Sequence, residues 1–162
     1  MAVPESFRSM PSAGPTFGLV GDVYVIRASG AQTGGALCVV EARVSPGGGP
    51  PPHVHSREDE SFYVLDGEIT FATAAGAVRA GPGAFLHMPR GVPHVFRNET
   101  DRDARMLFWC TPAGFERLVE AVGTPLAGPT AAAIPPTPEH IDLVIRTCPQ
   151  FGITILEKLG PS

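Results

Sequence analysis

The stretch that decides the fold is residues 47–67, which read GGGPPPHVHSREDESFYVLDG. The glycine and proline run at residues 47–52 excludes a helix, because proline lacks a backbone donor and glycine loses entropy in helix interiors. Two histidines follow at alternate positions, and an apolar run at residues 60–65 then leads into Asp66-Gly67. An Asp-Gly pair after an apolar run is a hairpin signal. The stretch therefore predicts strands joined by tight turns.

The composition of the whole chain agrees with this prediction. Its 162 residues include 19 glycines and 18 prolines, and 43 % of its residues are apolar. This length suits one domain, and the apolar fraction is sufficient for a core, so the turn formers indicate short strands rather than disorder. The 12 basic and 16 acidic residues give a formal net charge of −4 with no basic block, which disfavours a nucleic-acid partner.

The location of the protein is predicted from what the sequence lacks. Residues 1–16 show no signal-peptide pattern, and no apolar run reaches the roughly 20 residues of a membrane span. Cys38, Cys110 and Cys148 are widely separated and odd in number, which argues against a disulfide framework. We therefore expect a cytoplasmic protein with no membrane partner, in which the cysteines are small apolar residues.

The turn signals divide the chain into three parts of a single domain. We expect an arm at residues 1–16, a β-barrel core at 17–111, and C-terminal helices with a closing strand at 112–162. Turn signals recur every ~8–12 residues of the core, as in a sandwich or barrel. The predicted strands are 22–27, 36–44, 53–55, 60–65, 68–73, 77–79, 84–88, 94–97, 105–110 and, at the end, 154–156.

The C-terminal part carries two helix-start signals. Thr111-Pro112 offers an N-cap and a proline at the first helical position, and apolar residues at helical spacing then continue to Gly123. Thr137-Pro138 repeats the signal before a second helix. The Ala/Pro-rich segment 124–136 between the helices is predicted to be a loop, either a lid or a plain connector.

The histidines are the candidate functional residues. His53 and His55 lie at i and i+2, so an extended strand points both imidazoles to one face, as two ligands of one metal require. Imidazole nitrogen binds several first-row metals. Glu60 begins the next apolar run and offers a carboxylate, and His94 leads into a strand after a turn. The alternative for each histidine is a half-buried strand residue with no ligand role.

Other polar and aromatic residues receive weaker interpretations. Glu58 and Asp59 are expected to be solvated turn acids, and His140 a surface residue. His87 is expected to be a plain strand histidine, although a place beside the metal or the cavity is the alternative. Tyr24 and Tyr63 have side chains able to bind a ligand, without a sequence signal that they do so. The expected core residues, some of them facing a cavity, are Phe62, Val64, Phe71, Phe85, Phe96, Phe108 and Trp109.

Two segments resemble the signatures of the cupin superfamily. The first has the signature's spacing, with its fixed positions at Gly47, His53, His55, Glu60 and Gly67. The second follows it in the expected order, with its fixed positions at Gly83, Pro89, Gly91, His94 and Asn98. The resemblance covers roughly residues 17–112.

The resemblance implies a fold and a cofactor. The fold is all-β, a double-stranded β-helix or jelly-roll barrel, here with a C-terminal helical extension. The cofactor is one divalent first-row metal per chain, of identity Ni, Fe, Mn, Co, Cu or Zn. The implied metal ligands are His53, His55, Glu60 and His94. Similar cupins pair through a barrel sheet, which implies a homodimer.

The helical extension suggests a reaction. The string Phe115-Glu116-Arg117-Leu118, followed by the proline-rich loop, resembles bacterial quercetin 2,3-dioxygenase-like proteins. The resemblance implies an oxidoreductase that cleaves a flavonol-like or polyphenolic enol with O₂, with Glu60 as both metal ligand and general base. One alternative is a metal-dependent isomerase, cyclase or lyase acting on a small oxygenated metabolite. Another is a metal-anchored ligand-binding module without catalysis.

Overall fold

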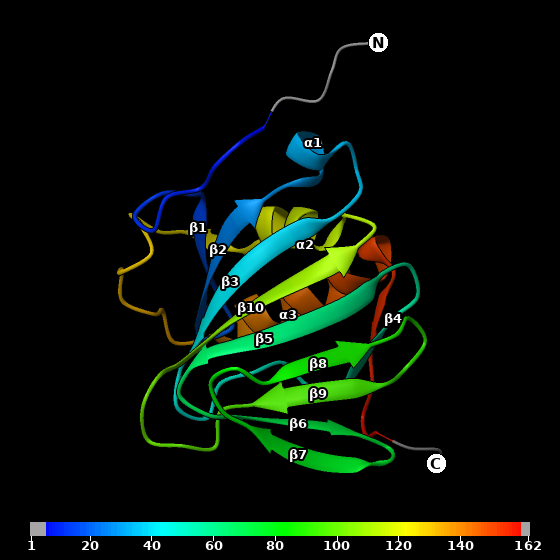
Figure 1. Ribbon diagram of the computed structural model, residues 1–162. Coiled ribbons are helices and arrows are strands. Elements are labelled where there is room, and N and C mark those ends of the chain that lie inside the picture. The colour runs from blue at the N-terminus through cyan, green and yellow to red at the C-terminus, as the bar shows by residue number, and fades with distance from the viewer. Residues whose placement is uncertain (1–5, 160–162) are drawn as a thin grey trace.

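The protein is a barrel of two facing antiparallel sheets, as a computed structural model describes it for residues 6–159 (Figure 1). The first sheet holds, in spatial order, β11 (Thr124–Pro125), β1 (Thr16–Leu19), β2 (Asp22–Ala28), β3 (Cys38–Val44), β10 (Ala104–Thr111), β5 (Asp59–Asp66) and β8 (Phe85–Met88). The second holds β12 (Ile153–Ile155), β4 (His53–His55), β9 (His94–Arg97), β6 (Ile69–Thr73) and β7 (Gly76–Ala80). The predicted all-β jelly-roll fold is confirmed.

The core lies between the two sheets and follows from the alternation of side chains along the strands. On β3, every second residue is buried. Phe62 of β5 joins the sheets, because its ring centroid lies 5.0 Å from that of Phe71 and 6.0 Å from that of Phe108. Burial of such aromatic side chains is a main source of folding free energy. The barrel interior is therefore packed with side chains up to the level of the histidines.

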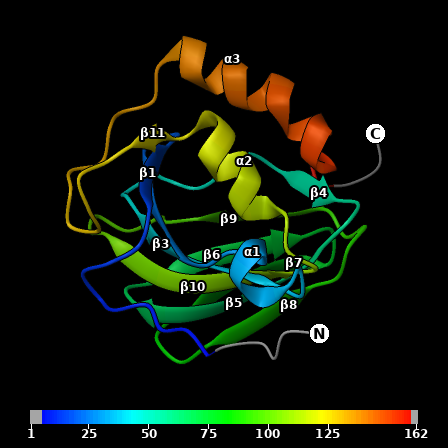
Figure 2. The same cartoon turned by 90° about the horizontal axis from the view of Figure 1, so that it is seen from above.

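The described part of the chain has four helical segments. They are α1 (Gly30–Thr33), α2 (Phe115–Val122), α3 (Pro138–Thr147) and the 3₁₀ helix η1 (Cys148–Phe151). Seen from above, α2 lies next to the strands and α3 lies outside it (Figure 2). In the described part of the chain, no helix has both the length and the apolar character needed to cross a membrane.

The starts of these helices match the sequence prediction in one case and differ in the other. Helix α3 begins as predicted, with the Thr137 hydroxyl accepting a hydrogen bond from the His140 N–H at 3.2 Å. The prediction that α2 begins at Pro112 was wrong, because β10 continues through Thr111 and the helix begins after Gly114. The short helix α1 lies between the first two predicted strands.

Two of the aromatic residues predicted for the core, Phe85 and Trp109, lie outside it. Phe85 is 58 % exposed, and its ring centroid lies 5.9 Å from that of Trp109 on the outer face of the first sheet. It belongs to β8, which is an edge strand of that sheet. An apolar residue on an edge strand can face outward without leaving a hole in the core, so a run of apolar letters does not reveal which face it occupies.

The N-terminal arm and the 124–136 segment both follow the barrel surface. The Arg27 guanidinium donates hydrogen bonds to the carbonyls of Met10 and Ala13 at 2.9 and 2.6 Å, which holds the described part of the arm against β2. Residues 1–5 of the predicted arm lie outside the described residues. The Leu126 N–H bonds the Thr16 carbonyl at 2.8 Å. Since 124–136 lines no part of the central cavity, the structure favours a connector over a lid.

Candidate metal centre

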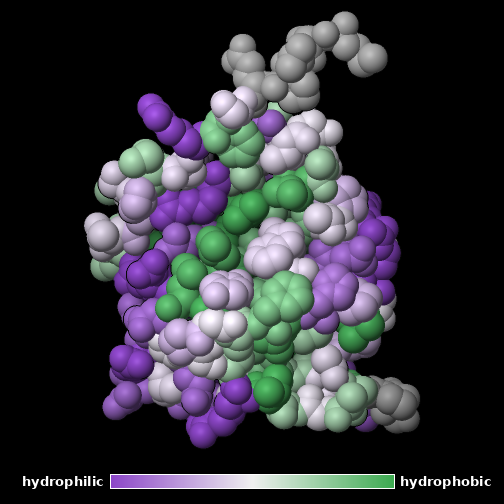
Figure 3. Space-filling model, in the orientation of Figure 1, coloured by the Kyte–Doolittle hydropathy of each residue, from purple (hydrophilic) through white to green (hydrophobic). Residues whose placement is uncertain are grey.

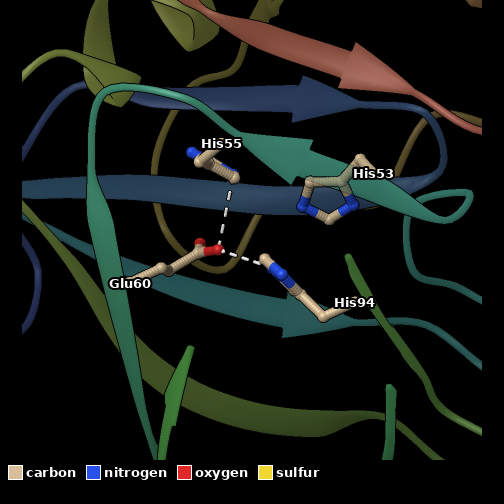
Figure 4. A group of neighbouring side chains, drawn as sticks. All are labelled: His53, His55, Glu60 and His94. Carbon is tan, nitrogen blue, oxygen red and sulfur yellow. Dashed lines mark hydrogen bonds and ion pairs between the residues drawn. The ribbon is translucent and has the colours of Figure 1, made fainter. Parts of the chain in front are cut away.

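Four side chains converge inside the barrel, where His53, His55, Glu60 and His94 each offer one ligand atom, all within 4.8 Å of one another (Figure 4). All four residues are buried, with 6, 2, 3 and 1 % of their surfaces exposed. The structure thus brings together every residue that the sequence suggested as a metal ligand. Three imidazoles and one carboxylate within this distance could hold a single metal ion.

The strands explain why these residues meet. His53 and His55 point to the same side of β4 because side chains alternate along a strand. His53 lies directly opposite His94 of the neighbouring strand β9. Glu60 reaches the same point from β5, which belongs to the other sheet. The group therefore spans both sheets, and only the folded barrel assembles it.

Each imidazole is fixed through the nitrogen that faces away from the group. His53 Nδ1 lies 3.0 Å from the Pro51 carbonyl, and His94 Nδ1 lies 2.9 Å from the Val92 carbonyl. Since a carbonyl only accepts, each Nδ1 carries the proton. Once a metal displaces any proton from Nε2, a neutral imidazole in that tautomer presents the Nε2 lone pair toward the centre, which is the arrangement found in metal-binding histidines.

The electrostatics of the group also fit a cation. Burial raises the pKa of Glu60, but the charge of His55 and the hydrogen bond with His94 outweigh burial, so the net pKa is lowered. Burial lowers the pKa of His55, but Glu60 and Glu58 reverse the direction and raise it. Burial, reinforced by the charge of His94, lowers the pKa of His53 to about 4. The group therefore combines an ionised carboxylate with imidazoles that compete for positive charge.

One atom tests directly whether the donors suit a metal. His55 Nε2 is buried without a hydrogen-bond partner in the described chain, although it lies 3.4 Å from Glu60 Oε2. His94 Nε2 lies 3.0 Å from the same oxygen. A buried nitrogen without a partner is costly, and coordination of a metal ion by its lone pair would satisfy it. The residues present therefore fit a divalent first-row ion, with one or two coordination positions left for a substrate.

Glu58 differs from what its sequence position predicts. It was expected to be a solvated turn acid, but it is only 3 % exposed, and its Oε2 lies 3.1 Å from His55 Nδ1. It therefore holds His55 as the backbone carbonyls hold the other two imidazoles. Asp59 fits the expectation better, since it pairs with Arg90 at 3.0 Å near the surface. The spacing of three residues between His55 and Glu58 was the available signal. It is a weak signal, because an acid on the surface can lie at the same spacing from a histidine.

The remaining histidines lie elsewhere. His87 is on the exposed face of β8, where its Nδ1 lies 2.8 Å from the Ser61 hydroxyl, so it is a plain strand histidine with no contact to the four-residue group. His140 is partly covered, because its Nε2 lies 2.8 Å from the Val122 carbonyl at the end of α2. His140 therefore ties α3 to α2 rather than standing free on the surface.

An apolar cavity opens beside the group, and His53 and Glu60 form part of its wall. Its volume is about 100 Å³. Helices α2 and α3 close one side, through Phe115, Leu118 and Val144. The further wall residues include Leu19, Asp22, Tyr24, Phe96, Phe108, Ile141 and Ile153. Asp22 is buried, and burial raises its pKa to about 6 against the lowering effect of hydrogen bonds from the Ser45 and Gly49 N–H groups.

Comparison with known proteins gives relatives of two kinds. The chain is 31 % identical over 111 residues to the quercetin 2,3-dioxygenase of Bacillus subtilis (strain 168). The matched region covers 68 % of this chain and 33 % of that protein. It is 33 % identical over 153 residues to the rhicadhesin receptor of Pisum sativum, which covers 89 % of this chain and 64 % of that protein. The chain thus spans between a third and two thirds of the length of these curated relatives.

A family model and a solved structure give two further likenesses. A family model for the cupin domain matches residues 40–110. The solved structure of the polyketide cyclase RemF from Streptomyces resistomycificus superposes with a TM-score of 0.56 at 20 % identity, covering 85 % of this chain and 92 % of that one. That likeness concerns the fold. With both signatures placed on the barrel strands, the chain contains a cupin domain and resembles the quercetin 2,3-dioxygenase-like proteins.

Proposed function

We propose that the protein is a metal-dependent dioxygenase that cleaves a flavonol-like or other polyphenolic enol with O₂. The observation that carries the proposal is the four-donor group opening into an apolar cavity. A site of this composition suits a flat, largely apolar molecule with one oxygen directed at the metal. The likeness to a quercetin 2,3-dioxygenase supports the choice of reaction.

The residues have separate roles in this proposal. His53, His55, His94 and Glu60 hold one first-row divalent ion, which when bound supplies a Lewis acid and, for redox-active ions, electron transfer to O₂. The Glu60 carboxylate also accepts the proton of the enol hydroxyl, for which its lowered pKa keeps it ionised. The apolar wall excludes water from the electron-rich enolate.

The size of the cavity limits what can bind without movement. A cavity of about 150 Å³ holds benzene, and the volume here is about 100 Å³. A flavonol therefore requires α3 to move outward, whereas a small enol needs less displacement. Helix α3 has no fully buried residue, so it is the wall element with the least packing to lose.

Oxygen uptake by metal-reconstituted protein tests the proposal. The panel contains flavonols and small enolisable diketones, each assayed with and without O₂. We expect uptake stoichiometric with substrate loss, no turnover under anaerobic conditions, and near-complete loss of turnover in Glu60→Gln with part of the metal retained. Full activity of Glu60→Gln would remove the proposed role of Glu60 as the base.

The same donor set also suits a reaction without O₂, because the small cavity favours a small oxygenated metabolite. A metal-dependent isomerase, cyclase or lyase would use the ion as a Lewis acid. Turnover that continues under anaerobic conditions would favour this class over the dioxygenase. Tight binding without turnover in either condition would instead indicate a metal-anchored binding module.

A further inference from the structure

Tyr24 occupies an unusual place in the wall of the cavity beside the metal centre. It lies on β2, is 5 % exposed, and belongs to the same wall as His53 and Glu60. Its ring stands edge-on to Phe108, with centroids 6.0 Å apart and planes at 81°. The ring is therefore held in one orientation by the core, with its hydroxyl group in a largely apolar wall.

Within residues 6–159 the Tyr24 hydroxyl has no hydrogen-bond partner, and it is reached from the cavity rather than sealed in the core, since the sealed side-chain atoms without a partner there are Arg43 Nε and His55 Nε2. The hydroxyl of a buried tyrosine side chain usually has a partner, which here a molecule in the cavity would supply. Asp22 is the other polar residue of β2 in the wall, but its carboxylate already accepts from the N–H groups of Ser45 and Gly49 at 2.9 and 3.0 Å. Phenylalanine would fill the same space without a polar group, so the hydroxyl is the part of this residue that a ligand in the cavity can use.

The charges around Tyr24 define what that ligand must offer. Burial, together with the negative charges of Asp22 and Glu60, raises the pKa of Tyr24 well above its ordinary value. The hydroxyl therefore keeps its proton at neutral pH and acts as a donor. The matching group on a ligand is an acceptor oxygen, such as a carbonyl, an ether or an enolate.

We propose that Tyr24 is a substrate-binding residue whose hydroxyl donates a hydrogen bond to a second oxygen of the substrate, in addition to the oxygen that faces the metal centre. This inference rests on the proposed function, since it takes the cavity as the substrate site. The substrate class is thereby narrowed to compounds with two oxygens, an enol or enolate and a separate acceptor, as in flavonols and β-diketones.

The chain offers a matched control, because Tyr24 and Tyr63 are its two tyrosines and Tyr63 is exposed on the outer face. Binding of pentane-2,4-dione to cobalt-loaded protein is measured by calorimetry in wild type, Tyr24→Phe and Tyr63→Phe. We expect Tyr24→Phe to weaken binding by about threefold to tenfold, the usual range for one hydrogen bond, with unchanged cobalt content. Tyr63→Phe should match wild type.

A spectroscopic measurement covers the case in which Tyr24→Phe fails to fold. In Tyr63→Phe, Tyr24 is the remaining tyrosine, so the Raman tyrosine doublet reports its hydrogen bonding alone. We expect the doublet to shift toward a donating phenol when the probe is added. An unchanged doublet, or equal affinity of wild type and a folded Tyr24→Phe, overturns this inference while leaving the proposed function standing. Failure of the probe to bind wild type contradicts both.

Discussion

At the scale of single residues, the candidate site depends on hydrogen bonds made on the far side of each imidazole. The Pro51 and Val92 carbonyls orient His53 and His94, and the Glu58 carboxylate orients His55. Such outer partners fix the tautomer and raise the basicity of the coordinating nitrogen. Of these three outer partners, Glu58 is the one that acts through its side chain, so a mutation can change it without altering the backbone.

Replacement of Glu58 should weaken metal binding without removing a ligand. Glu58→Gln keeps the shape of the side chain but loses the charge beside His55 Nδ1. We expect metal affinity to fall about 10- to 100-fold, as for other outer partners of metal-binding histidines, measured by competition with a chelator. The control is Asp59→Asn, which alters the neighbouring half-buried acid. Equal affinities in both variants would contradict a role for Glu58.

Metal affinity should also depend on pH, with binding weaker in acid. The pKa of His55 is raised above its ordinary value, so in the metal-free protein a proton occupies His55 over a wider pH range than usual. A metal ion must displace that proton, and below the raised pKa each pH unit should lower the apparent affinity about tenfold. Competition titrations from pH 8 to pH 5 measure this slope. A flat profile would show that no ligand gives up a proton.

At the scale of secondary-structure elements, the turns of the first signature place the strands. Gly67 has φ of +75°, and a Cβ there would lie 2.8 Å from Ala104 Cα of β10. Both the conformation and the close approach require glycine. The turn after β5 therefore sets how β5, which carries Glu60, lies against β10.

Substitution at this turn should destabilise the barrel. We expect Gly67→Ala to lower the free energy of unfolding by more than about 1 kcal/mol, measured by denaturant unfolding of the metal-free protein. Gly81→Ala is the matched control, because Gly81 has open space around its Cα and no positive φ. Equal stability of the two variants would show that β5 and β10 can separate to make room.

The sequence predicted strands better than it predicted their ends and faces. The spacing of His53 and His55 predicted their common face because alternation is a property of the backbone alone. The predicted start of α2 was wrong because Thr111-Pro112 has the pattern of a helix start. In the structure, Thr111 instead pairs with Asp59, which extends β10 through Thr111. The burial of Glu58 depends on contacts between segments that are distant in the sequence, since Gly114 lies against its carboxylate.

At the scale of the whole molecule, an apolar band crosses the outer face of the first sheet (Figure 3). It includes the exposed rings of Tyr63 and Phe85, with Trp109 beside Phe85. Leu107 of β10 belongs to the same face and lies opposite Glu41 of β3. Glu41 in turn pairs with Arg105. Exposed apolar surface of this kind often marks a contact between proteins. We propose that two copies of the chain pair through this face as a homodimer.

The pairing is tested by placing a charge in the band. We expect wild type to sediment as a dimer and Phe85→Glu to shift toward the monomer, because the charge would be desolvated in the contact. Val78→Glu is the control, since Val78 is similarly exposed, at 52 % against 58 %, but belongs to β7 of the other sheet. A monomeric wild type, or an equally dimeric Phe85→Glu, would contradict this contact.

The central claim is that the barrel holds a metal ion between His53, His55, Glu60 and His94. Metal analysis of protein purified without chelators, compared between wild type and His94→Ala, tests it most directly. The account predicts roughly one first-row metal ion per wild-type chain, as for a single site of this kind, and sharply reduced content in a His94→Ala variant with unchanged circular dichroism. A metal-free wild type, or equal occupancy in the variant, would contradict it.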